Sequence, residues 1–360
     1  MKRLSFILLA ANLTVERIID VYSSAIWTER YYESGDFELY MPATRELIDA
    51  VNVDFNSQSA KYICRADDLT KCGIIERVTI TTDAENGNYL TVSGRKLDSF
   101  IFRRVVIQQT TYTGSPQAII KQLLYNSFIN PADNDRKVAN FEIQPATLSS
   151  DSFIITAQYD GANVGEEIEK LCYSYGIGYK ITLDLENKKF IFSLYEGTDR
   201  TIDQNDVAPV IFSNDFNNLL SSSYTADSTN QKKCAVVAGE GFGTSRVKVL
   251  VKSPSSGLGL SEIFVNAQNT SANGGELTAD AYEAALREEG QNALSEYRVV
   301  HEAEGEVAAN YGFILNQDYF LGDLVTVKNE YGITMSPRVV EIIEADDETG
   351  YSCIPTFAQH

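Results

Sequence analysis

Apolar and polar residues alternate through most of the N-terminal part of the chain, and this period of two is typical of half-buried β-strands. Residues 37–41, 74–82 and 89–93 follow it, and the last two flank a glycine-containing reversal at 83–88. Two such segments around a reversal predict a β-hairpin with a longer loop. The apolar run 4–11 follows a basic start, as in a secretory signal peptide, but it continues the same rhythm and predicts a first strand.

Helical spacing replaces the alternation in three longer segments. The first runs from Ser115 to about Asn130, the second covers residues 165–175, and the third runs from Thr278 to about Tyr297. A serine or threonine before such a segment accepts hydrogen bonds from the first free N–H groups, so Ser115 and Thr278 predict helix starts. The pattern also predicts a short helix at 44–50 and strands at 179–185, 189–195, 211–212, 234–238, 246–252 and within 299–357.

The order of these elements divides the 360 residues into three regions. We predict a β-rich domain at 1–110, which residues 97–106 close, and a helix followed by an α/β module at 111–209. A second β-rich domain at 210–360 carries a helical insertion at about 255–298. Residues without either period predict loops, at 131–151 and 266–275. The fold class is β-rich α+β, and the length exceeds that of a single small domain.

Fifty acidic residues against thirty basic ones give a formal charge of −20. Phosphate binding needs clustered Lys and Arg, so the charge argues against a generic nucleic-acid binder. The five cysteines show no CxxC spacing and predict neither a disulfide framework nor a zinc site. We expect reduced thiols and cytoplasmic folding. No apolar stretch is long enough to cross a membrane.

One glycine-rich segment could indicate a phosphate-binding loop. Gly239, Gly241 and Gly243 have part of the required spacing, but such a loop must lead into a helix whose N-terminus faces the phosphate. The residues that follow, RVKVLV, predict a strand. We therefore predict a hairpin here and no cofactor.

The histidines give no catalytic pattern. His301 and Glu302 start as the HExxH motif of zinc proteases does, but position 305 is Gly, so a second metal-ligating histidine is missing. A serine or cysteine nucleophile needs a base, and the only other histidine is His360. We predict that His301 lies on the surface of a strand, with no metal site and no catalytic residue.

Neighbouring carboxylates could indicate glycoside hydrolysis, which needs one protonated and one ionised acid at a fixed distance. They occur at Asp67-Asp68, Glu166-Glu167, Glu288-Glu289 and Asp346-Asp347-Glu348. We predict that these acids lie in turns or on solvated helix faces, because fifty acids produce chance neighbours. Tyr31, Tyr32 and the tyrosines of 173–179 could stack on sugars, but packing in a core or interface is their more ordinary use.

Three segments together resemble the tail-hub proteins of long-tailed bacteriophages, of the Gp37-like or Gp27-like kind found in siphophages and prophages. They are IWTERYYESGDFELYMP, GIIERVTITTDAENGNYLTVSGRKLDSFIFRRVV and YFLGDLVTVKNEYGITMSPRVVEIIEADDETGYSCIPTF. Their order and spacing carry the resemblance, which spans about residues 4–357. It is weakest at 110–150 and 253–280.

The resemblance implies a homotrimer at the virion tail tip, assembled in the cytoplasm of the bacterial host. Each subunit of such a hub has two barrel-like β domains, so three subunits make a pseudo-sixfold ring below a hexameric tail tube or distal-tail ring. It implies further contacts with a tape measure protein and with a tail fibre or receptor-binding protein. DNA would only pass through the channel, which suits an acidic chain.

We therefore hypothesise a structural baseplate or tail-tip protein, not an enzyme, that acts as a trimeric symmetry adaptor. Larger relatives carry a C-terminal hydrolase or receptor-binding extension, whereas this sequence stops directly after its last predicted strand. Two alternatives stay open. A tail-associated cell-wall hydrolase needs a cleft that holds an acid of raised pKa, and a glycan-binding adhesin needs an exposed tyrosine cluster. The residues of any interface are not indicated.

Overall fold

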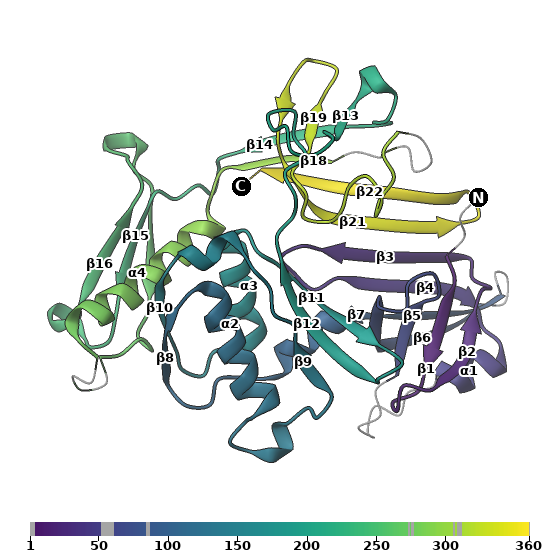
Figure 1. The fold of residues 1–360 in the computed structure, drawn as a ribbon, viewed down its shortest axis with the longest axis horizontal. Helices are drawn as coiled ribbons and strands as arrows, with labels where there is room; N and C mark the ends of the chain where they lie inside the picture. The colour runs from purple at the N-terminus through teal and green to yellow at the C-terminus, as the bar shows by residue number, and fades with distance from the viewer. Residues whose placement is uncertain are drawn as a thin grey trace.

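The computed structural model describes residues 4–51, 61–83, 87–272, 274, 277–304, 307 and 312–359. Figure 1 shows a long sheet, a helical part packed beside it, and a smaller unit of strands and one helix at the far end of the molecule. The fold is thus β-rich with separate helical parts, which confirms the predicted α+β class.

The largest sheet has eleven strands in the order β14-β18-β22-β21-β3-β4-β7-β6-β5-β1-β2. Its N-terminal strands are β1 (Phe6–Leu9), β2 (Val15–Ile19), β3 (Ser24–Arg30), β4 (Asp36–Pro42), β5 (Tyr62–Arg65), β6 (Cys72–Asp83) and β7 (Gly87–Lys96). Its later strands are β14 (Ser223–Asp227), β18 (Val300–Glu304), β21 (Arg338–Asp347) and β22 (Gly350–Gln359). β1 confirms the predicted first strand, and the antiparallel pair β6–β7 confirms the predicted hairpin.

β3 and β21 join the two ends of the chain. Ser24–Arg30 pairs antiparallel with residues 341–347, so the strands of both predicted β-rich regions share one hydrogen-bonded order. Among the described residues no pairing closes this order into a barrel, and the two barrel-like domains, like the domain boundaries, stay a prediction. Beneath the N-terminal strands lies an apolar core around the buried Trp27, which stacks on Phe37 at 5.8 Å between ring centroids.

A mixed α/β unit packs against the β5–β6 side of this sheet. It contains a 3-10 helix (Leu97–Arg103), β8 (Thr110–Gly114), α2 (Pro116–Leu124) with a π-helical turn (Tyr125–Ile129), β9 (Phe141–Ile143), β10 (Ile155–Tyr159), α3 (Val164–Tyr175), β11 (Gly178–Asp184) and β12 (Lys189–Tyr195). Ser115 caps α2 by accepting a hydrogen bond from the Ala118 N–H, as predicted. The predicted hairpin of β11 and β12 is confirmed.

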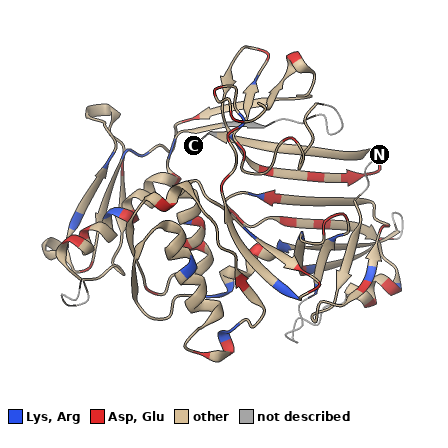
Figure 2. Ribbon diagram, in the orientation of Figure 1, with Lys and Arg blue, Asp and Glu red and all other residues tan. Residues whose placement is uncertain are grey.

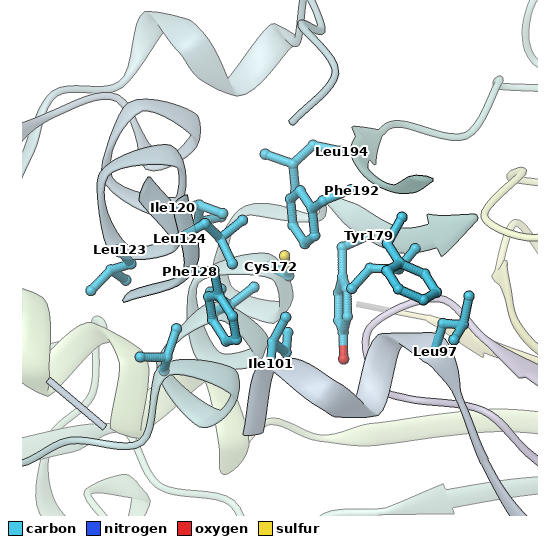
Figure 3. Packing of buried hydrophobic residues seen from close by; sticks show 14 of the residues in the cluster. Leu97, Ile101, Ile120, Leu123, Leu124, Phe128, Cys172, Tyr179, Phe192 and Leu194 are labelled. Carbon is cyan, nitrogen blue, oxygen red and sulfur yellow. The ribbon is translucent and has the colours of Figure 1, made fainter. Parts of the chain in front are cut away.

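Side chains from several elements of this unit meet around Cys172 of α3 (Figure 3). They include Ile101 of the 3-10 helix, Leu124 of α2, Tyr179 of β11 and Phe192 of β12, all buried. One correction concerns residues 131–151, predicted as a loop. They contain β9, which pairs parallel with β12 and therefore depends on a partner distant in sequence.

The unit at the far end, which we call the arm, consists of β15 (Cys234–Ala238), β16 (Lys248–Lys252), β17 (Glu262–Asn266) and α4 (Ala279–Glu296) (Figure 1). β15 pairs antiparallel with β16, as predicted, and parallel with β17, which the sequence pattern missed. Thr278 caps α4 by accepting from the Ala281 N–H, and the helix ends before Tyr297, as predicted.

Two small elements complete the fold. α1 (Arg45–Val51) confirms the predicted short helix. β13 (Ile211–Ser213), β19 (Thr326–Lys328) and β20 (Thr334–Met335) form a three-stranded sheet. Its core includes Phe212, which packs edge-on against Tyr319 at 5.2 Å and reaches Phe357 of β22.

A buried charged cluster links these parts. Arg65 of β5 and Glu344 of β21 are both 1% exposed and pair at 2.9 Å. Glu29 of β3 pairs with Lys71 at 2.9 Å and lies 3.8 Å from Lys96 of β7. Burial opposes the charge on Glu29, but Lys96 and Lys71 outweigh it and hold its pKa well below the usual value. The cluster therefore stays ionised inside the protein.

Replacing Arg65 tests this cluster. Arg65→Met leaves Glu344 buried without its main partner and should lower the free energy of unfolding by about 3–5 kcal/mol, measured by chemical denaturation at pH 7. Arg95→Met is the control, because its pair with Glu76 is partly exposed, and it should cost less than about 1 kcal/mol. The double variant R65M/E344M should recover much of the loss.

The same pair predicts a pH dependence. Burial raises the pKa of Glu344, but Arg65 overrides this and lowers it overall. The stabilisation by this carboxylate is therefore present above its unfolded pKa of about 4.3 and is lost as pH falls through the folded pKa. The gap between the wild type and Arg65→Met should narrow on acidification below about pH 4. A gap that stays constant with pH would contradict the pairing.

Candidate assembly surfaces

The glycine-rich segment is a hairpin loop. It leads from β15 through a short 3-10 turn at Gly243–Ser245 into β16, with no helix after it. Gly239 lies against Tyr282 of α4, where a Cβ would meet the phenol oxygen at 2.0 Å, and that oxygen accepts a hydrogen bond from the Glu240 N–H. The loop is shaped by packing on α4, so the predicted hairpin is confirmed.

His301 lies on β18, as predicted for a strand histidine. Its Nδ1 is 3.0 Å from the hydroxyl of Tyr224 on the neighbouring β14. The side chain of Glu302 and position 305 lie outside the described residues. Within the described part of the chain, no group of three His, Cys, Asp or Glu side chains could hold a metal ion. The five cysteines are all buried thiols.

Two predictions about the acids are wrong. Asp346 lies within β21 and not in a turn, is 3% exposed, and accepts hydrogen bonds from the Tyr22 hydroxyl and the Leu4 N–H. Glu288 of α4 is 4% exposed and accepts from the Tyr175 hydroxyl at 3.0 Å, so it does not lie on a solvated face. Both burials depend on partners distant in sequence. Asp67 and Asp68 do lie in a turn, where Asp67 binds Arg65.

The carboxylates of α3 and α4 gather where these helices pack. Burial raises the pKa of Glu289 to about 7, and the charges of Glu167 on α3 and of Glu288 add to this, while Lys170 opposes them. Lys170 itself pairs with Glu167 at 2.8 Å. Glu167, Glu288 and Glu289 thus belong to one inter-helix contact, whereas Glu166 is exposed on its helix, as predicted.

A groove of about 460 Å³ lies beside this contact and is lined by Tyr32, Glu33, Glu166, Glu169, Tyr173 and Glu296, among others. Burial raises the pKa of Glu169 to about 7, and the Tyr179 hydroxyl donates a hydrogen bond to this carboxyl at 3.0 Å. Most of the tyrosines pack inward. Tyr31 is fully buried, and Tyr32 is 6% exposed and packs edge-on against Tyr173 at 5.2 Å, which confirms the core interpretation.

Two surfaces are open for assembly. β2 and β14 are the edge strands of the long sheet, and within the described residues neither has a second hydrogen-bonded neighbour. β2 exposes Val15 and Ile18 at 57% and 62%. All residues of β14 are exposed except Tyr224. An exposed edge can pair with another chain through its free backbone groups.

The second surface is the outer face of the arm. Val236 stands in register between Leu250 and Phe264, which are 53% and 57% exposed and form an apolar row across the three strands. Alternate residues share a face of a strand, so Lys248 and Lys252 flank this row. Figure 2 shows acidic residues along both halves of the long sheet and on the helices. The sequence pattern missed these surfaces, because exposed and core strands have the same apolar alternation.

The chain matches the family model of the Siphovirus ReqiPepy6 Gp37-like protein over residues 7–357. The chain belongs to this family. No curated protein matches it. No described helix is long and apolar enough to cross a lipid bilayer.

Solved structures share the fold across nearly the whole chain. A tail protein from Neisseria meningitidis MC58 is 13% identical, with a TM-score of 0.59, and the match covers 98% of this chain and 96% of that one. The 43 kDa tail protein of prophage MuSo2 from Shewanella oneidensis is 15% identical, with a TM-score of 0.55 and the same coverage. Prophage tail protein gp18 from Listeria monocytogenes EGD-e is 12% identical, with a TM-score of 0.55 and coverage of 99% and 94%. The resemblance to siphophage tail proteins is thus confirmed for the family and the fold.

The contact between α3 and α4 predicts a pH dependence for this family member. The folded pKa of Glu289 is raised to about 7, so its protonated form stabilises the fold. That contribution is complete below the unfolded pKa of about 4.3 and is lost as pH rises toward 7. Glu289→Gln should therefore be about 1–3 kcal/mol more stable than the wild type at pH 8 and equal to it near pH 4, as measured by urea denaturation.

Glu283→Gln on the same helix is the matched control. Glu283 is half exposed and pairs with Arg287, so this change should alter the stability by less than about 0.5 kcal/mol at either pH. Equal stabilities of Glu289→Gln and the wild type at pH 8 would show that Glu289 ionises freely.

Proposed function

We propose that this protein is a structural tail-hub component of a phage tail tip or baseplate, without enzymatic activity. It assembles as a homotrimer and adapts a hexameric tail tube or distal-tail ring to the tip and the receptor-binding apparatus. Family membership and the fold shared with tail proteins support this proposal. The observation that carries it is one long sheet with an open edge at each end of its strand order.

Open edges favour head-to-tail association. The backbone N–H and C=O groups of β2 can pair with those of β14 in the next copy, and the exposed Val15 and Ile18 add apolar area at the same edge. Two different surfaces that meet in this way produce a ring when the rotation closes. A ring of three copies uses every edge, which removes the aggregation hazard of the free subunit.

The junction between β3 and β21 fits the change of symmetry. It joins an N-terminal and a C-terminal set of strands in each subunit, so three subunits present six β-rich units to a sixfold ring above. In the proposed assembly the tape measure protein and the tail fibre or receptor-binding protein bind the same hub at the virion tail tip. The formal charge of −20 suits a channel that DNA crosses without binding.

The oligomeric state tests the proposal. Light scattering after size exclusion should give a mass of about 120 kDa for the trimer, from a chain of 39.9 kDa. Ile18→Lys places a charge on the β2 edge and should weaken trimer formation at least about tenfold, because the edge can no longer pair without burying a lysine. Its melting temperature at low concentration should be unchanged.

Ile154→Lys is the matched control, because Ile154 is 71% exposed but lies outside the long sheet, just before β10. It should leave the trimer intact. A wild-type chain that stays monomeric at high concentration, or a trimer that both variants weaken equally, would contradict pairing through β2.

A cell-wall hydrolase is the second candidate, and one observation favours it. The groove beside α3 holds Glu169, whose pKa is raised to about 7 as a general acid requires, with acidic and tyrosine neighbours. The same carboxyl accepts a hydrogen bond from the buried Tyr179. A structural role in the core therefore explains its position without a catalytic one.

A lysis assay separates the two candidates. We expect purified wild-type protein to release no fragments from peptidoglycan, and Glu169→Gln to behave as the wild type does in mass and in assembly. Release of fragments that Glu169→Gln abolishes would establish the hydrolase and overturn the proposal that the protein is purely structural.

A further inference from the structure

An arginine pair near the π-helical turn lacks acidic partners. Arg104 donates to the backbone carbonyl oxygens of Arg103 and Arg136, at 3.0 and 3.5 Å, and Arg136 donates to that of Val105 at 2.7 Å. Within the described residues, neither guanidinium has a carboxylate within 4.0 Å. The nearby Arg103 reaches only Glu76, which already binds Arg95 through both oxygens.

The position of Arg104 lowers the stability of the folded chain. Its Nε is buried and has no hydrogen-bond partner. Burial lowers its pKa, and the charges of Arg136 and Arg103 lower it further. A buried donor without a partner is destabilising, and so are like charges packed together. In a chain with twenty more acids than bases, an arginine pair without a carboxylate indicates a place kept for an external anion.

An apolar pocket adjoins Arg104, and Arg136 lies next to Arg104 outside the pocket lining. The pocket has a volume of about 160 Å³, and its lining includes Tyr62, Phe100, Phe128 and Phe190 together with Arg103 and Arg104. The rings support one another, with centroids of Phe100 at 5.5 Å from Phe128 and 6.0 Å from Phe190. Phe128 belongs to the core in Figure 3, and the Arg104 guanidinium lies 5.6 Å from its ring centre. The pocket is therefore a firm apolar hollow with positive charge at its rim.

The size and the charge decide the class of occupant. Pockets for whole organic ligands have volumes of about 300–1,000 Å³, so this one accommodates a single apolar side chain. Guanidinium groups bind carboxylates through charge-assisted hydrogen bonds, which the terminal nitrogens of Arg104 and Arg136 can donate. Aromatic anchors in a pocket next to a charge-assisted contact are typical of the residues that dominate protein interfaces.

We propose that this pocket is a docking site for an acidic peptide segment of a partner protein, in which a large apolar side chain stands beside Asp or Glu. The apolar side chain enters the hollow that Phe100 and Phe128 help to line, and the carboxylate binds Arg104 and Arg136. The site does not depend on trimerisation, since all of its residues come from one chain.

Calorimetry with short peptides tests the site. The probe is acetyl-Gly-Asp-Phe-Asp-Gly-amide, titrated into the full chain at about 50 mM salt, with Asn in place of both Asp as the matched probe. The acidic peptide should bind with a dissociation constant below about 1 mM, and the Asn peptide should bind at least about tenfold more weakly. Octanoate is titrated as a second probe, because a site for any apolar acid would bind it as tightly as the peptide.

Arg104→Met separates recognition from a structural role. It should weaken the acidic peptide at least about tenfold, yet its melting temperature should stay within about 2 °C of the wild type or rise, because Arg104 has no carboxylate partner to lose. Val138→Phe, at the pocket wall, should fill the hollow and give the same loss. Arg45→Met, with an 87% exposed side chain on α1, should change neither binding nor stability.

The outcomes are decisive in either direction. Loss of peptide binding in Arg104→Met and Val138→Phe, with both folded, supports the site. Absence of binding at millimolar peptide, equal binding of the Asn peptide, or octanoate binding as tightly as the peptide would overturn it. A fall of several degrees in the melting temperature of Arg104→Met would show that this arginine holds the fold together instead.

Discussion

The arrangement of the whole molecule depends on the buried charges around Arg65 and Glu344. Arg65 comes from β5 and Glu344 from β21, while Asp98 of the 3-10 helix lies 3.8 Å from Lys96 and accepts the Ile181 N–H of β11. The N-terminal strands, the C-terminal strands and the α/β unit therefore meet at one polar point. An ion cluster of this kind gives little net stability compared with apolar packing, but a shift of any strand leaves a charge unpaired. The buried ion cluster therefore favours one register of these strands over shifted ones.

The same ion pair connects the N-terminal and C-terminal strands of the long sheet. The pairing of β3 with β21 brings residues some three hundred positions apart into one ladder, and the stacked Trp27 and Phe37 support β3 from below. The sheet carries its two edge strands, β2 and β14, at opposite ends of this strand order, so its twist sets the angle between them. Since the angle between unlike edges sets how many copies close a ring, the buried charges and the proposed oligomer are physically connected.

Local sequence signals predicted the helices and hairpins of this fold. Elements that depend on partners distant in the sequence were not predicted. Caps at Ser115 and Thr278 and the reversal before β7 act within a few residues, so the sequence shows them directly. β9 and β17 are short strands whose parallel partners lie far away, and no period marks them. The burial of Glu288 depends on α3 packing against α4. The pocket beside Arg104 combines residues from six separate stretches of chain, and the sequence contains no motif for it.

Net charge limits how such a chain can associate with itself. Copies that each carry −20 repel one another, and this repulsion opposes a closed ring most strongly at low salt. Backbone pairing between edges and burial of Val15 and Ile18 do not depend on charge, and salt screens the repulsion that opposes them. Arg104 and Arg136, which have no carboxylate partner among the described residues, are then better suited to bind an acidic partner than another copy of this acidic chain. The proposed self-assembly through β2 and β14 and the proposed partner binding through Arg104 thus use different residues.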